Sequence, residues 1–128
     1  MLAGKDPAPT LAVSDLQRAR DFYEKTLGLT SLRDLPGGGV LYQSGNAAVL
    51  VYESQYAGTN QATAVSWAVG DDFDAIVEDL KAKGATFERY DGLPETTREG
   101  DVHVTGDFKA VWFKDPDGNI LNLVNMTM

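Results

Sequence analysis

The stretch that decides the fold is "AVSDLQRARDFYEKTLGL", residues 12 to 29, because it recurs as "AVGDDFDAIVEDLKAKGA", residues 68 to 85. Each copy combines an apolar strand end, an acidic helix start and a closing glycine. The identical pairs that are 56 residues apart include Ala12/Ala68, Val13/Val69, Asp15/Asp71 and Gly28/Gly84. Identities at one constant spacing indicate an internal repeat, which must be recognised before the fold is assigned.

Each copy predicts one helix. In the first, Ser14 and Gln17 form a capping-box pattern, in which the two side chains satisfy free backbone donors. Apolar residues then recur at helical spacing, and Gly28 suits a left-handed C-terminal cap. The stripe consists of Leu16, Ala19, Phe22, Tyr23 and Leu27.

The second helix begins at Asp71 and Asp72 and ends at Gly84. Its apolar stripe consists of Phe73, Ile76, Val77 and Leu80. We interpret the carboxylates at its start as helix-capping groups that complement the dipole, and not as metal ligands.

Three strand candidates follow each helix, separated by turn signals such as "PGGG", "SGN" and "DPDG". They span 30–35, 39–44 and 46–53 in the first half, and 86–91, 107–114 and 119–124 in the second. The long segment 92–106 between two of them is a candidate lid. The sequence therefore predicts an α+β fold of two βαβββ repeats, approximately 6–54 and 62–126 of a single domain 1–128. Its curved mixed sheets would surround a cleft, with the helices on the outer face.

Composition excludes several classes of protein. The chain has 128 residues, a net charge of −8 and no cysteine. Without clustered Lys and Arg, we expect no nucleic-acid binding, and without thiols there is no zinc–thiolate site. No apolar run is long enough for a signal peptide or a membrane span, so we expect a cytoplasmic protein without a membrane partner.

The repeated helix motif and the C-terminal "WFKDPDGNILNL" resemble those of the vicinal oxygen chelate superfamily. This superfamily includes glyoxalase I, extradiol dioxygenases, fosfomycin-resistance enzymes and bleomycin-resistance proteins. The resemblance spans nearly the whole chain. In metal-dependent members it implies four His or Glu ligands, one from each of four cleft-lining strands.

The four positions that the resemblance marks as metal ligands hold Ala8, Val49, Ala64 and Asn122. Zinc, iron and nickel need imidazole, carboxylate or thiolate donors, and neither a methyl group nor one neutral amide can replace them. We therefore expect no metal, no other cofactor and no glyoxalase-type activity.

Strand alternation from these positions predicts which side chains line the cleft. Thr10, Val51 and Ser66 would face inward, whereas Leu50, Tyr52 and Trp67 would face the helices. Alternation does not determine which way Trp112 and Tyr42 face. The expected ligand-binding residues are Ala8, Thr10, Val49, Ala64, Ser66, Trp112, Asn122 and His103.

We expect a metal-free protein that binds or sequesters a small organic ligand as a homodimer, as in the bleomycin-resistance branch. The acidic charge would favour a cationic ligand. The alternative is an enzyme of the superfamily that uses an atypical metal site or metal-free acid–base chemistry. The only histidine, His103, is the catalytic candidate for that alternative.

Overall fold

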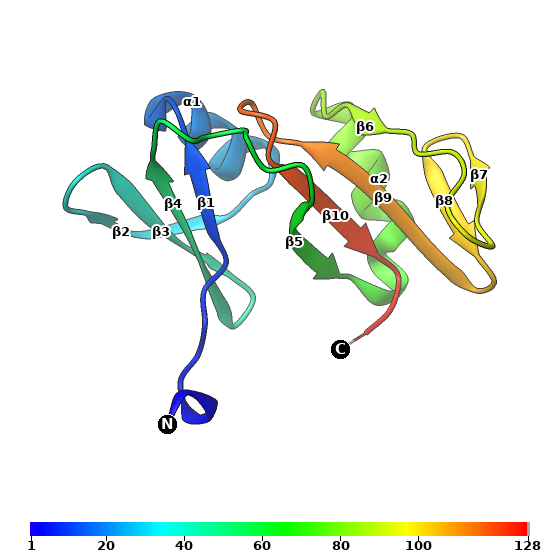
Figure 1. Ribbon diagram of the computed structural model, residues 1–128, viewed down its shortest axis with the longest axis horizontal. Helices are drawn as coiled ribbons and strands as arrows, with labels where there is room; N and C mark the ends of the chain where they lie inside the picture. Colours follow the sequence, from blue (N-terminus) through cyan, green and yellow to red (C-terminus); the bar gives the residue numbers. More distant parts are fainter. Residues whose placement is uncertain (128) are drawn as a thin grey trace. The chain divides into compact units, whose positions relative to one another are not determined.

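The computed structural model, which describes residues 1–127, has the expected α+β architecture with two separate sheets (Figure 1). The chain divides into two compact units. One comprises residues 1–64 and 115–119, and the other comprises residues 65–114 and 120–127. No helix within residues 1–127 is long and apolar enough to cross a membrane.

The first unit contains a mixed four-stranded sheet in the order β1-β4-β3-β2. Its strands are β1 (Thr10–Val13), β2 (Thr30–Leu35), β3 (Gly39–Ser44) and β4 (Ala47–Glu53). Strand β1 pairs with β4 in parallel, and the other pairs are antiparallel. Helix α1 (Leu16–Arg20) passes directly into π-helical turns at Asp21–Thr26.

One face of this sheet packs against the helix. The Tyr23 ring of the helix lies 6.1 Å from that of Tyr42, and the Tyr42 hydroxyl donates to Glu24. Tyr42 therefore faces the helix, which answers the question left by the sequence. The buried side chains of this core include Leu11, Val13, Ala19, Tyr23, Val40, Tyr42, Val49 and Val51. We call the opposite face of the sheet its open face.

Helix α1 starts one residue later than its sequence predicts. The N-cap is Asp15, whose Oδ1 accepts from the Arg18 amide at 3.1 Å. Ser14 instead donates through both its amide and its hydroxyl to Asp117. The predicted capping box at Ser14 and Gln17 is wrong, because a residue distant in sequence takes the Ser14 side chain.

The second sheet has six strands in the order β5-β10-β9-β8-β7, with β6 also paired to β9. The strands are β5 (Thr63–Ala68), β6 (Phe87–Glu88), β7 (Thr97–Glu99), β8 (Val102–Thr105), β9 (Phe108–Lys114) and β10 (Ile120–Val124). Figure 1 shows helix α2 (Phe73–Ala82) behind β9 and β10.

Helix α2 follows a 3₁₀ turn at Gly70–Asp72, and its Phe73, Val77 and Leu80 are buried. Asp72 occupies the N-cap but makes no side-chain capping bond, so that part of the prediction is wrong. At the other end Gly84 has a φ of 89°, and two backbone bonds close the helix in a Schellman motif.

The segment 92–106 is not a structureless lid. Its residues 97–105 form the antiparallel β7–β8 hairpin, and β8 pairs with β9. The predicted strand at 86–91 shrinks to Phe87–Glu88, because β8 takes the rest of the same edge of β9. Between β6 and β7, residues 89–96 lie outside helices and strands.

The turn "DPDG" and Asn119, which join β9 to β10, belong to the first unit. The buried Asp115 carboxylate accepts from the Tyr23 hydroxyl at 2.7 Å and from the Asn119 amide at 2.8 Å. Burial, with the Asp115 charge beside it, raises the pKa of Tyr23. Asp117 accepts from Ser14 and forms an ion pair with Arg18 at 3.1 Å. The turn is thus held by side-chain bonds as well as by its backbone.

Candidate functional site

The register of the first sheet fixes which side chains lie on its open face. Thr10 pairs with Leu50 and Leu11 pairs with Val51 in the parallel β1–β4 ladder. Partners in register point to the same side, so Leu50 shares the open face with Thr10. Val49 and Val51 lie with the helix-side core, and Val49 is only 2% exposed.

The predicted inward facing of Val49 and Val51 is therefore wrong. Because side chains alternate with a period of two, a one-residue error in the repeat alignment moves a whole strand to the other face. Tyr52 is reversed for the same reason: it pairs with Ala12 and is 40% exposed. Ala48, the neighbour of Val49, takes the open-face position.

A hollow of about 590 Å³ lies in the first unit at the end of this open face. Its lining includes Asp6, Ala8, Leu32, Gln43, Asn46 and Ala48. Gln43 is the ladder partner of Ala48, and Leu32 sits where the β2–β3 register shifts between Ser31 and Arg33. The volume is within the range of small-molecule sites. Two alanine methyl groups, of Ala8 and Ala48, thus line a space large enough for an organic molecule.

The second sheet brings four of the expected site residues together on one face, which we call its open face. It is the face opposite the buried Val111, Phe113, Leu121 and Leu123. Trp112 is the ladder partner of Asn122, whose Oδ1 accepts from the Ser66 hydroxyl at 2.8 Å. The His103 ring lies 4.8 Å from that of Trp112, edge to face. Exposed Ala64 precedes Ser66 by two residues on β5 and so shares its side of that strand.

The Asn122 amide is fully used within the sheet. Besides accepting from Ser66, it donates through Nδ2 to the Val111 carbonyl at 3.0 Å, and the side chain is buried. An amide with satisfied partners stabilises a buried site. Asn122 therefore ties β5, β9 and β10 together.

His103 is held in one tautomer. Its Nε2 accepts from the Tyr90 backbone amide at 2.9 Å, so the proton of the neutral ring is on Nδ1. The side chain is 2% exposed, and Nδ1 has no hydrogen-bond partner among the described residues. Since the Nε2 lone pair is already used, His103 is poorly arranged for the general-base role that the sequence allowed.

The groups around His103 pair with one another. Tyr90 packs 5.9 Å from His103 and 5.5 Å from Trp112, ring centre to ring centre. Burial raises the pKa of Tyr90, and Glu88 raises it further. Lys114 lies 2.9 Å from Glu88, which raises the pKa of Lys114. The rings of this cluster therefore pack closely, and most of its polar groups have hydrogen-bond or ion-pair partners.

A further ion pair lies next to this cluster, between Arg98 and Asp91. The Arg98 guanidinium hydrogen-bonds Asp91 at 2.9 Å and lowers the pKa of that carboxyl. It anchors the segment that follows Tyr90 to strand β7.

The residues at the expected metal positions do not fit a metal. Ala8 and Ala64 offer methyl groups, and the open-face residue on β4 is also an alanine, Ala48. Asn122 offers an amide that is already bonded. Within residues 1–127 no group of three or more His, Cys, Asp or Glu side chains could hold a metal ion. The donor set of this chain therefore lacks what zinc, iron or nickel requires.

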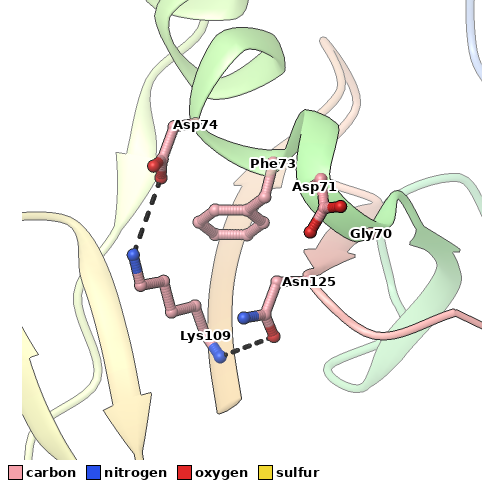
Figure 2. A pocket seen from close by; sticks show the side chains of 6 residues that line it. All are labelled: Gly70, Asp71, Phe73, Asp74, Lys109 and Asn125. Carbon is pink, nitrogen blue, oxygen red and sulfur yellow. Dashed lines mark hydrogen bonds and ion pairs between the residues drawn. The ribbon is translucent and has the colours of Figure 1, made fainter. Parts of the chain in front are cut away.

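A smaller recess of about 150 Å³ lies at the start of α2 (Figure 2). Figure 2 shows the Phe73 ring beside the Lys109 ammonium, which lies 3.8 Å from Asp74. The Asn125 side chain accepts from the Lys109 amide at 2.9 Å. These contacts connect the N-terminal end of α2 to strand β9.

Sequence reasoning missed several residues of the first sheet's open face. Ala48 could have been found, because the alternating Val49 and Val51 match the apolar alternation of the core residues Leu11 and Val13. Leu32 and Gln43 carried no sequence signal. The register shift in β2 brings Leu32 to the hollow, and the pairing of Gln43 with Ala48 brings Gln43 there.

Comparison with known proteins supports this architecture. Residues 7–123 match the family model of the Glyoxalase/Bleomycin resistance protein/Dioxygenase superfamily. No curated protein sequence matches the chain.

Solved structures resemble the chain in fold. A fosfomycin resistance protein, FosX, from Listeria monocytogenes has a TM-score of 0.71 at 16% identity, covering 95% of this chain and 93% of that one. An integron cassette protein from the mobile metagenome of a Halifax Harbour sewage outfall has a TM-score of 0.67 at 21% identity, covering 91% and 94%. Lactoylglutathione lyase from Agrobacterium tumefaciens has a TM-score of 0.63 at 20% identity, covering 90% and 88%. With a family model matched over nearly its whole length, the chain belongs to the Glyoxalase/Bleomycin resistance protein/Dioxygenase superfamily.

Proposed function

We propose that this protein binds a small organic molecule without a metal ion. The observation that carries the proposal is the hollow lined by Ala8 and Ala48. Ala8 is a position where the resemblance to metal-dependent members implies a ligand, and Ala48 lies beside it on the same face. Methyl groups there leave space and offer apolar contact, whereas imidazole and carboxylate groups would hold a cation.

Sequestration accounts for the site better than catalysis does. Binding by apolar burial needs only a shaped hollow with a few polar groups at its edge. Acid–base catalysis needs a side chain whose lone pair or proton can reach the substrate. The Nε2 atom of His103 is engaged by Tyr90, and Asn122 is engaged by Ser66 and Val111.

The proposal includes two further expectations from the sequence. Homodimer formation follows from the resemblance to the bleomycin-resistance branch, and light scattering coupled to gel filtration tests it. A cytoplasmic location agrees with the absence of cysteine, and fractionation of cells expressing the natural gene tests it.

Thermal-shift screening of small organic compounds tests the proposal. A compound that binds the folded state at about 100 times its Kd stabilises it by about 2.7 kcal/mol, which is a readily measured shift of Tm. The control is Ala48→Leu, which fills the hollow from a half-buried open-face position. We expect this variant to fold and to lose the shift. A compound that stabilises wild type and Ala48→Leu equally binds elsewhere and contradicts the assignment of the hollow.

Isothermal titration with Zn²⁺, Mn²⁺ and Ni²⁺ tests the metal-independent part. We expect no stoichiometric binding, and we expect compound binding to be unchanged by EDTA. Tight binding of one metal ion per chain would sink the proposal.

A metal-free enzyme is the second candidate, and one observation favours it. The buried Nδ1–H of His103 has no partner among residues 1–127. It could therefore donate a hydrogen bond to a bound molecule that reaches it. If a reaction is found, His103→Ala should lower kcat, and His103→Gln should not restore it. Unchanged turnover in both variants removes His103 from the chemistry.

A further inference from the structure

We infer that the hollow in the first unit selects an organic amine in its ammonium form. The amine's N–H groups would meet Asp6 and Gln43, and its apolar body would lie against Ala8, Ala48 and Leu32. This inference rests on the proposed function and names its class of ligand.

The polar groups of the hollow are arranged to accept hydrogen bonds. Gln43 already donates through Nε2 to the Gly45 carbonyl at 3.1 Å, which leaves its Oε1 as an acceptor. The Asp6 carboxylate is an acceptor, and no ion pair ties it to any residue within 1–127. A carboxylate and an amide oxygen in the same lining are complementary to a ligand that carries several N–H groups.

The charge of the residues that line the hollow favours a cation over an anion. Among its described lining residues there is no Lys, Arg or His to pair with a ligand carboxylate or phosphate. The chain carries a net charge of −8, so its field also draws cations toward open sites. Exposed charges are screened by salt, so this preference should weaken as ionic strength rises.

The apolar side of the hollow is built by a strand irregularity. Arg33 pairs with Leu41, and Ser31 pairs with Tyr42, so Leu32 between them has no ladder partner of its own in the β2–β3 register. Its side chain is 51% exposed and lines the hollow. Bulges of this kind redirect side chains beside binding sites. An exposed leucine beside two alanine methyl groups suits a hydrocarbon or aromatic body.

The test uses three probes that share a flat body and differ in charge: naphthylmethylamine, naphthylmethanol and naphthoate. Each is titrated into ¹⁵N-labelled protein near neutral pH, and binding is followed by the amide signals of Ala8, Asn46, Ala47 and Ala48. We expect the amine to shift these signals with an affinity up to about fivefold higher than that of the alcohol, which is the upper value for one exposed ion pair. We expect naphthoate to bind weakest.

Two charge-neutralising variants separate recognition from the general field. Asp6→Asn should weaken amine binding by about fivefold and leave alcohol binding unchanged. Glu99→Gln, at an exposed position on β7, changes net charge equally and should alter amine binding by less than about twofold. Ala48→Leu should reduce binding of all three probes, because it removes the space.

Three results would contradict the inference. If the three probes bind at these amides with equal affinity, the hollow is a binding site and the amine selectivity is wrong. If Asp6→Asn and Glu99→Gln weaken the amine equally, a diffuse field and not Asp6 attracts it, which also overturns the inference. If no probe shifts these amides, the inference fails, and the compound screen and metal titration described above judge the proposed function separately.

Discussion

The two open faces differ although they come from the two copies of one repeat. On the first sheet, Ala8 and Ala48 line a hollow, and the exposed Tyr52 and Leu32 lie on or beside that face. On the second sheet, Ser66, Asn122, Trp112 and His103 form a connected polar and aromatic set. The first face thus has space and the unpaired acceptors of Asp6 and Gln43. On the second face most buried polar groups hydrogen-bond one another, although His103 Nδ1 has no partner among residues 1–127. Where metal ligands are absent, one sheet face of this fold thus leaves space for a ligand, and the other is occupied by packed side chains.

The strongest test of this comparison is a pair of substitutions one residue apart on β4. Val49→Asp should destabilise the protein by more than about 3 kcal/mol or prevent folding, because it buries an unpaired charge in the helix-side core. Ala48→Asp lies on the open face and should change the free energy of unfolding by about 1 kcal/mol or less. Urea unfolding followed by circular dichroism measures both.

Val49→Ala keeps this test usable if Val49→Asp does not fold. Its expected loss is about 2 kcal/mol from the cavity it leaves. Equal effects of the two Asp substitutions would show that the facing of β4 is not the one given by its register with β1.

Removing the amide of Asn122 should have the next largest effect. Asn122→Ala leaves the Ser66 hydroxyl and the Val111 carbonyl without this partner, so we expect a loss of about 1–3 kcal/mol. Ser66→Ala removes one of these bonds and should cost about 1 kcal/mol. A double-mutant cycle in urea should show coupling between the two sites. Additive effects would mean that the bond does not contribute, and the second face would then be less satisfied than its geometry indicates.

His103 tests whether its acceptor atom or its ring matters. His103→Ala leaves the Tyr90 amide without its bond and should cost about 1–2 kcal/mol. His103→Gln can supply an amide oxygen near the position of Nε2, so it should lose less. Long-range ¹H–¹⁵N spectra of the wild-type imidazole should show the Nδ1–H tautomer. Observation of the Nε2–H tautomer would contradict the Tyr90 bond and restore His103 as a possible base.

The smallest effect at neutral pH belongs to the tyrosines on the helix side of the first sheet. Burial raises the pKa of both Tyr23 and Tyr42, and hydrogen bonds to Asp115 and Glu24 raise it further. Their stabilising contribution is fully present below the unfolded-state pKa of about 10. It is lost as pH rises above that value, because the unfolded chain ionises first.

Absorbance at 295 nm measures this difference during alkaline titration. Of the five tyrosines, Tyr23 and Tyr42 should stay protonated until the protein unfolds. In denaturant all five should titrate together near pH 10. Ionisation of every tyrosine near pH 10 in the folded protein would contradict the buried contacts of this core. Tyr23→Phe removes one of the two groups and should flatten the decline of stability above about pH 10.

Local sequence patterns predicted much of the fold. Strands at 30–35 and 39–44 match the structure, since alternating side chains between glycine turns are a short-range signal. Both helices were found from their apolar stripes. The helix start was missed by one residue because Ser14 binds Asp117, which lies far away in the chain. The hairpin at 97–105 was missed because its pairing with β9 gives it order.

The candidate site was predicted less completely. Ser66 and Asn122 were expected to face inward, and they lie on one face of the second sheet. Trp112, whose facing the sequence left open, and His103, which was expected in a loop, lie on that face as well. Val49 was placed on the wrong face, and Ala48 was missed, because the alignment of the two repeats slipped by one residue. In a strand, that is enough to exchange the core face for the open face.

The sequence by itself determined the repeat, the α+β class, and the residue types at the expected metal positions. Those features depend on neighbours a few residues apart, or on atoms that a side chain either has or lacks. Only the tertiary structure decided that Val49 is core and Ala48 is open, and that Leu32 is turned outward. It also decided that the lone pair of His103 is occupied. The facing of β4 depends on its register with β1, the position of Leu32 on the register shift between β2 and β3, and the His103 lone pair on its bond to Tyr90. No local sequence pattern specifies these pairings.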